Sequence, residues 1–138
     1  MLALMTHTLE TKLEITSWVE DTVHEMADGA KITRATVSLS GNGDTLAGGT
    51  FDAVMFYRPD GTSSYVSIMH VTGALQGHEG GFVLQGEGAF DGTTASSRST
   101  VVSGSGSGKL AGLTGRARSD STHDDYPFMP MTLAYDLG

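Results

Sequence analysis

Residues 51–102 read FDAVMFYRPDGTSSYVSIMHVTGALQGHEGGFVLQGEGAFDGTTASSRSTVV. Three turn signals divide this stretch, Pro59-Asp60-Gly61, Gly77-His78 and Asp91-Gly92, and each lies between runs rich in β-branched and aromatic residues. This pattern predicts consecutive β-hairpins. Because side chains alternate across a strand, the turns also determine which residues share a face of the sheet.

One of the two predicted faces carries no formal charge and consists mostly of large apolar side chains, so we place it inside the protein. It comprises Phe51, Ala53, Met55, Tyr57, Tyr65, Ser67, Met69, Val71, Phe82, Leu84, Gly86, Gly88 and Phe90. The other face carries charges, including Glu87 diagonal to Arg98 across the third hairpin, and we place it outside. It comprises Asp52, Val54, Phe56, Arg58, Val66, Ile68, His70, Val83, Gln85, Glu87, Ser96 and Arg98.

Apolar side chains also gather on the predicted outer face. They are Val54, Phe56, Val66, Ile68 and Val83. Such a patch favours packing against another subunit over exposure to water. We therefore expect a homo-oligomer.

The rest of the chain adds further strands and no extended helix. We predict eight strands over residues 13–18, 32–40, 50–58, 62–75, 82–90, 93–102, 116–121 and 131–137. The acidic stretch 20–29 lacks a sustained helical period and is interpreted as a loop. Closure removes exposed strand edges, so we expect an all-β, eight-stranded antiparallel up-and-down barrel. It would form one domain over residues 1–138, with residues 1–6 as a candidate disordered extension.

Composition excludes several classes of partner. The formal charge is −8 with only eight Lys and Arg, which argues against nucleic acid and against anionic membranes. No apolar run reaches the roughly 20 residues of a membrane helix. There is no cysteine, and the five histidines are scattered without the spacing of a metal site. We expect a soluble cytoplasmic protein without metal or cofactor.

Four segments resemble an uncharacterised bacterial family of single-domain barrels related to plant allene oxide cyclase. They are LEITSW (13–18), FYRPDGT (56–62), GFVLQG (81–86, continuing to Phe90) and GSGSGKLAGLTG (104–115). The resemblance implies an allene-oxide-cyclase-like barrel, often oligomeric, with a mostly apolar cavity. In enzyme members of the superfamily such a cavity folds a flexible substrate for ring closure.

The resemblance also implies site residues. Glu14 matches the first-strand glutamate of the plant enzyme, and Thr16 stands where that enzyme has an asparagine. Ala53 stands in place of a third-strand cysteine, and Tyr65 resembles the aromatic wall residue of the fourth strand.

The residue types themselves leave alternatives open. Glu14 in an apolar barrel would have a raised pKa and could serve as a general base or hold a water; otherwise it is a solvated glutamate paired with Arg34 or Lys12. Tyr57 and Tyr65 could orient a ligand oxygen or simply fill space. The inward methionines suit an adaptable pocket and equally a packed core.

These observations predict a barrel that binds a small, largely apolar organic molecule. In the catalytic version it is a cyclase or isomerase with Glu14 as the catalytic residue. The alternatives are a non-catalytic carrier or sensor, and a structural oligomeric barrel without ligand. The predicted substrate-binding residues are Thr16, Ala53, Met55, Tyr57, Tyr65, Met69, Phe82 and Leu84.

Overall fold

The computed structural model describes residues 5–41 and 45–138, which form eight β-strands and one short 3-10 turn, η1 (Gly108–Leu110). The strands are β1 (His7–Glu25), β2 (Lys31–Ser40), β3 (Leu46–Tyr57), β4 (Ser63–Leu75), β5 (His78–Phe90), β6 (Thr94–Val101), β7 (Thr114–Thr122) and β8 (Phe128–Asp136). Within these residues, no helix is both long enough and apolar enough to cross a membrane.

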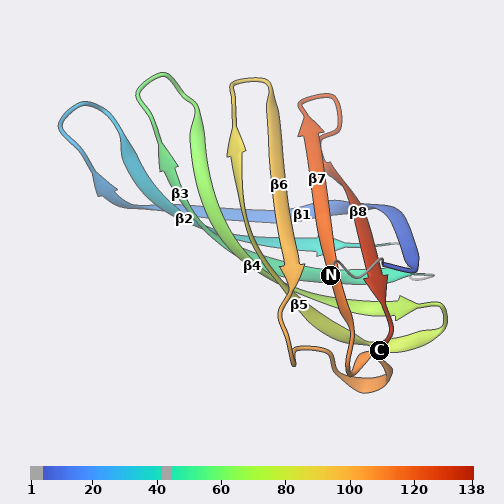
Figure 1. The fold of residues 1–138 in the computed structure, drawn as a ribbon. Helices are drawn as coiled ribbons and strands as arrows, with labels where there is room; N and C mark the ends of the chain where they lie inside the picture. The colour runs from blue at the N-terminus through green and yellow to red at the C-terminus, as the bar shows by residue number, and fades with distance from the viewer. Residues whose placement is uncertain (1–4, 42–44) are drawn as a thin grey trace.

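The strands form a ring in which each pairs antiparallel with its neighbours in sequence (Figure 1). β1 closes the ring against β8, from His7 opposite Tyr135 to Glu14 opposite Phe128. The predicted all-β fold of eight antiparallel strands is therefore confirmed.

All three predicted hairpins are present, but the turn predicted at Gly77-His78 lies one residue earlier, because His78 already belongs to β5. Asp91 accepts hydrogen bonds from the backbone N–H groups of Thr93 and Thr94, at 2.9 and 2.8 Å. The β4–β5 turn is centred on Gln76 and Gly77, both with positive φ, which is the geometry of a tight hairpin whose twist matches its strands.

β1 is longer than predicted at both ends, since it begins at His7 and since residues 20–25 of the acidic stretch are strand and not loop. The pairing of β1 with β2 shifts register twice, between Ile15 and Ser17 and between Thr22 and His24. Each shift inserts an extra residue into β1 and interrupts the alternation of its side chains. This interruption explains why the sequence pattern did not indicate a strand here.

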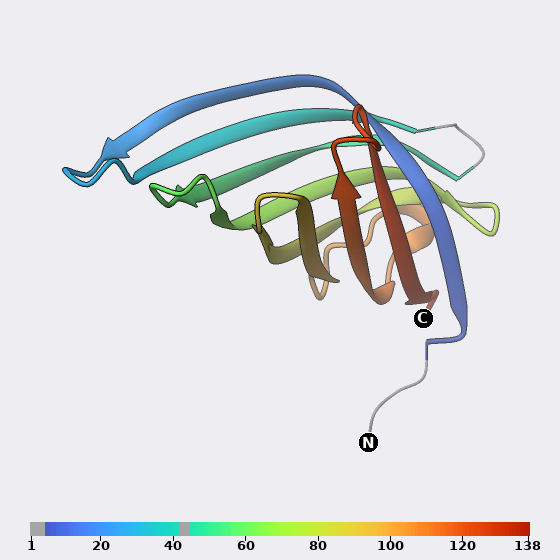
Figure 2. The same cartoon turned by 90° about the horizontal axis from the view of Figure 1, so that it is seen from above.

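The ring is wider at one end, which we call the open end. Among the described residues, β1 beyond Ile15 has strand pairing with β2 on one side and none on the other. The β1–β2 hairpin consequently projects well past the ends of β7 and β8 (Figure 2). The inner face of the sheet is thus partly uncovered at the open end.

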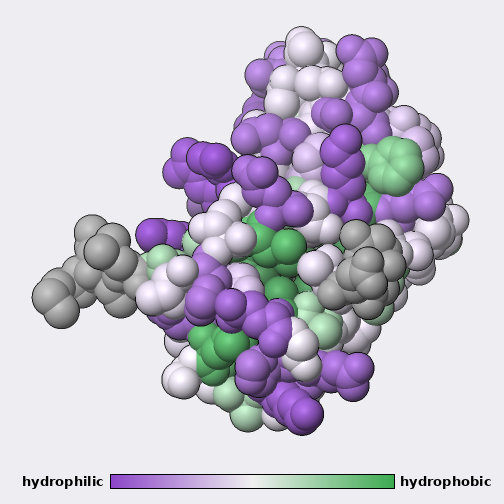
Figure 3. Space-filling view, turned by 90° about the vertical axis from the view of Figure 1, so that its right-hand side faces the viewer, coloured by the Kyte–Doolittle hydropathy of each residue, from purple (hydrophilic) through white to green (hydrophobic). Residues whose placement is uncertain are grey.

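The apolar core fills the ring at the opposite end. Figure 3 views that end and shows apolar side chains at its centre, framed by hydrophilic ones. Fully buried core residues include Leu13, Val37, Val71, Phe82 and Leu133. The predicted inner set from residues 51–90 is buried or half-buried, and most of the predicted outer set is exposed, so the face assignment is confirmed.

Two predictions fall partly outside the described residues. Of the proposed N-terminal extension 1–6, residues 1–4 lie outside them, while the backbone N–H of Thr6 donates to Oδ1 of Asp136 at 3.0 Å. The cluster of turn-forming residues at 41–44 also predicts a turn, of which residues 42–44 lie outside the described residues.

Candidate functional site

The structure brings seven of the predicted site residues together on the inner face of the ring. Met55 lies directly opposite Tyr65, and Met69 opposite Leu84, on neighbouring strands. The seven are Ala53, Met55, Tyr57, Tyr65, Met69, Phe82 and Leu84, all buried or half-buried.

Glu14 and Thr16 do not join them. Glu14 is exposed on the outer face between Ser40 and Phe128, because its neighbours Leu13 and Ile15 point inward. Thr16 is exposed, and its hydroxyl donates to the Ser38 carbonyl at 3.3 Å. The expectation of Glu14 as a carboxylate inside the ring is therefore wrong.

The interior around Met69 and Leu84 is tightly packed. A hollow of about 30 Å³ lies among serines and methionines of β4, β6, β7 and β8, including Ser67, Met69, Ser97 and Met131. That volume holds about one or two water molecules, whereas ligand pockets usually measure about 300–1,000 Å³. In this conformation, this hollow is too small for an organic ligand.

A different carboxylate, Glu20, reaches the inner face at the open end. One of its oxygens accepts hydrogen bonds from the Thr33 hydroxyl at 2.7 Å and the Tyr57 hydroxyl at 2.8 Å. The other accepts one from the indole N–H of Trp18 at 2.8 Å. We call Trp18, Glu20, Thr33 and Tyr57 the Glu20 network.

Burial and hydrogen bonding determine the protonation states of Glu20 and Tyr57. Burial raises the pKa of Glu20, but the hydrogen bonds from Thr33, Trp18 and Tyr57 outweigh it, so the pKa lies below its ordinary value. Burial, together with the hydrogen bond to Glu20 and its charge, raises the pKa of Tyr57 to about 12. At neutral pH the network therefore pairs an ionised carboxylate with a protonated phenol.

Aromatic rings surround the network. Trp18 is 44% exposed, and its ring meets the ring of Phe51 edge-on, with centroids 6.2 Å apart. The Lys31 ammonium lies 5.3 Å from the centroid of the Tyr57 ring. The open end thus presents an aromatic surface beside a fixed negative charge.

The sequence argument missed Glu20 because it interpreted residues 20–29 as a loop. Extending the predicted strand would not have found Glu20 either, because the first register shift exchanges the inward and outward faces of β1. Counting by twos from inward-facing Ile15 would bring Val19 and Val23 inside. Instead they are 59% and 64% exposed, and Trp18 and Glu20 face inward. Because the apolar valines lie outside and the charged Glu20 lies inside, the alternation of apolar residues in the sequence does not indicate which side chains face inward here.

A metal site is not formed within the described residues, where no group of three or more His, Asp and Glu side chains is arranged to hold an ion.

A crystal structure of a protein of unknown function from the DUF3224 family of Shewanella oneidensis MR-1 superposes with a TM-score of 0.71 over 94% of this chain and 96% of that one. At 22% identity this likeness shows a shared fold. No curated protein matches the chain. The family model described as "Protein of unknown function (DUF3224)" matches residues 9–135, and the chain therefore belongs to the DUF3224 family.

Proposed function

We propose that this protein binds a small organic molecule on the inner face of its open end. The observation that carries the proposal is the Glu20 network, an ionised carboxylate held by three donors beside the half-exposed ring of Trp18. A carboxylate fixed in this way is a preorganised acceptor for a ligand hydroxyl or N–H group.

The surroundings of the network specify the ligand further. Trp18 and Phe51 provide aromatic surface against which a flat apolar body can stack. Tyr57 and Thr33 already direct their hydroxyl hydrogens to Glu20, which leaves the carboxylate as the acceptor for a ligand donor. The expected ligand is therefore largely apolar and carries at least one hydrogen-bond donor.

The protonation states favour binding over catalysis. A carboxylate with a lowered pKa is a weak base, and a phenol with a pKa of about 12 is a weak acid. A carrier or sensor fits these groups better than a cyclase or isomerase. In a cyclase or isomerase version, the protein would act mainly by holding one substrate conformer. Glu20 would then take the catalytic role that the sequence analysis gave to Glu14.

A second candidate function is a structural, oligomeric ring without ligand. The small interior hollow and the exposed Val54, Phe56, Val66 and Ile68 favour it. In this version the outer patch packs against another subunit. The cytoplasmic location stays a prediction under both candidates.

Native mass spectrometry of the protein purified from its own host tests the proposal. Wild type and the control Glu14→Gln should retain the same small-molecule adduct, whereas Glu20→Gln and Trp18→Ala should lose it. The control is matched because Glu14 lies on the same strand but faces outward. A ligand-free wild type of defined oligomeric state would favour the structural candidate, and an adduct retained by Glu20→Gln would exclude the proposed site.

A further inference from the structure

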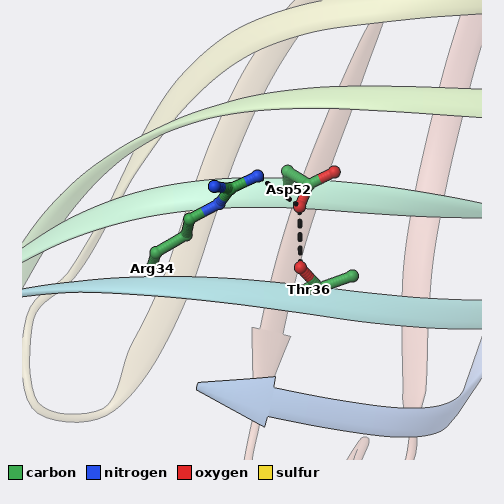
Figure 4. A network of polar contacts seen from close by, with 3 residues as sticks. All are labelled: Arg34, Thr36 and Asp52. Carbon is green, nitrogen blue, oxygen red and sulfur yellow. Dashed lines mark hydrogen bonds and ion pairs between the residues drawn. The ribbon is translucent and has the colours of Figure 1, made fainter. Parts of the chain in front are cut away.

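A broad hollow of about 1180 Å³ lies on the outer face of the sheet, on the opposite side from the Glu20 network. Four of the chain's five arginines line it: Arg34, Arg98, Arg116 and Arg118. Figure 4 shows one edge, where the Asp52 carboxylate accepts from the Thr36 hydroxyl at 2.7 Å and lies 3.7 Å from the Arg34 guanidinium. We call this region the arginine hollow.

The charge of the arginine hollow is opposite to that of the protein. The chain has a formal charge of −8, yet four arginines against two carboxylates, Asp52 and Glu87, leave the hollow with +2. Half of the eight cationic side chains thus line one hollow. A local positive field in an acidic protein attracts small anions to that position.

Two of the arginines are placed where they repel each other. Arg98 on β6 and Arg118 on β7 are directly opposite partners, an arrangement that destabilises a sheet. Within the described residues, no carboxylate forms an ion pair with either one. Glu87 is also directly opposite Arg98, not diagonal as expected, and still makes no ion pair with it. An anion bound between the two guanidinium groups would remove their repulsion.

Apolar side chains form the other part of the hollow. Val54, Val66 and Ile68 line it on β3 and β4, and the exposed fractions of Val66 and Ile68 are 58% and 48%. Val54, Val66, Glu87, Arg98 and Arg118 are successive cross-strand partners in one row. At about 4.8 Å per strand, the row places Val54 roughly 14 Å from Arg98.

We propose that the arginine hollow is a binding site for a small amphipathic anion. Arg98 and Arg118 hold its carboxylate or phosphate head, since guanidinium groups bind both kinds of oxyanion through paired hydrogen bonds. Its apolar body extends across β5 and covers Val66 and Val54. The length of the row suits an unbranched chain of medium length.

A free small molecule fits this site better than a membrane or a second copy. The overall charge of −8 opposes approach to an anionic membrane surface. At about 1180 Å³ the hollow lies just above the usual size of small-molecule pockets, about 300–1,000 Å³, so it has room for a ligand of medium length. Covering it with a second copy would bury the unpaired arginines of both chains unless that copy supplied carboxylates to them.

Titration calorimetry of the full chain with decanoate tests the proposal, with 1-decanol as the uncharged probe of equal length. Decanoate should bind with one site per chain and more tightly than 1-decanol. The Arg98→Gln/Arg118→Gln variant should weaken decanoate binding about tenfold or more, because charge-assisted hydrogen bonds are lost. Thermal unfolding of this variant without ligand should show no loss of stability, because the repulsion is also removed.

The control variant is Arg58→Gln, which removes the one arginine outside the hollow and should change affinity less than about twofold. Equal losses in Arg58→Gln and in the double variant would overturn the proposal, as would equal affinities for decanoate and 1-decanol. Binding to phosphatidylglycerol vesicles without binding to free decanoate would assign the site to a membrane. A decanoate-insensitive dimer that dissociates in Val66→Asp would assign it to a second copy.

Discussion

Tyr57 donates its hydroxyl hydrogen to Glu20 at 2.8 Å, joining β3 to β1 across the intervening strand β2. Glu20 is itself paired with Ala35 of β2, so the bond passes diagonally over that strand. It holds the projecting part of β1, which in the described residues has a strand neighbour on one side. The same bond orders the open end and positions its carboxylate.

Removing this hydroxyl should weaken the open end measurably. We expect Tyr57→Phe to lower the free energy of unfolding by about 1.5 kcal/mol, the lower end of the range for a hydrogen bond to a charged group, since Glu20 is only partly buried. The pKa of Glu20 should rise, because one of its three donors is lost. Urea unfolding and a carboxylate titration by NMR measure the two effects. Tyr126→Phe, at an exposed phenol, is the control; an unchanged Glu20 pKa in Tyr57→Phe would contradict the geometry.

Acid titration should isolate the contribution of Glu20. Its pKa is lowered in the folded protein, so its stabilisation is present above its ordinary pKa of 4.5 and is lost as the pH falls through the folded value. The difference in unfolding free energy between wild type and Glu20→Gln should therefore be largest near neutral pH and shrink below about pH 4.5. Asp60, Asp91 and Asp136 also have lowered pKa values. They affect both proteins equally and cancel in the difference, so a difference that persists unchanged at low pH would contradict the prediction.

The fold could be predicted from the sequence because the turn residues have specific chemical and conformational properties. Asp91-Gly92 supplies a side-chain acceptor and a residue with positive φ, and both are used in the turn. Since turns determine register, the faces of β3 to β5 followed correctly from alternation alone. The site was less predictable. One extra residue near Thr16 exchanges the inward and outward faces of β1. The position of this extra residue depends on the pairing of β1 with β2, which the sequence of β1 alone does not determine.

Substitution of the exposed Glu14 should change stability little, whereas substitution of the buried Phe82 should lower it strongly. We expect Glu14→Gln to change stability by less than about 0.5 kcal/mol, as exposed positions usually do. Phe82 is fully buried, and Phe82→Ala should cost about 3–5 kcal/mol by leaving a cavity in the ring. Urea unfolding of both variants measures these values. A large loss in Glu14→Gln would show that this carboxylate has a structural partner that the outer face does not reveal.

Gly88 should tolerate no side chain, because the ring of Tyr65 lies over it from the neighbouring strand. A methyl group at Gly88 would lie 2.4 Å from Cζ of Tyr65 and 2.6 Å from the carbonyl oxygen of Ser96. The tyrosine ring can move aside, but the backbone oxygen is held by the β5–β6 pairing. We expect Gly88→Ala to lower the unfolding free energy by about 1–3 kcal/mol, in the range of overpacked cores. The control is Ala89→Ser, an exposed neighbour on the same strand, which should stay within about 0.5 kcal/mol of wild type. Equal unfolding midpoints for the two variants would mean that neither the Tyr65 ring nor the Ser96 carbonyl oxygen restricts the space above Gly88.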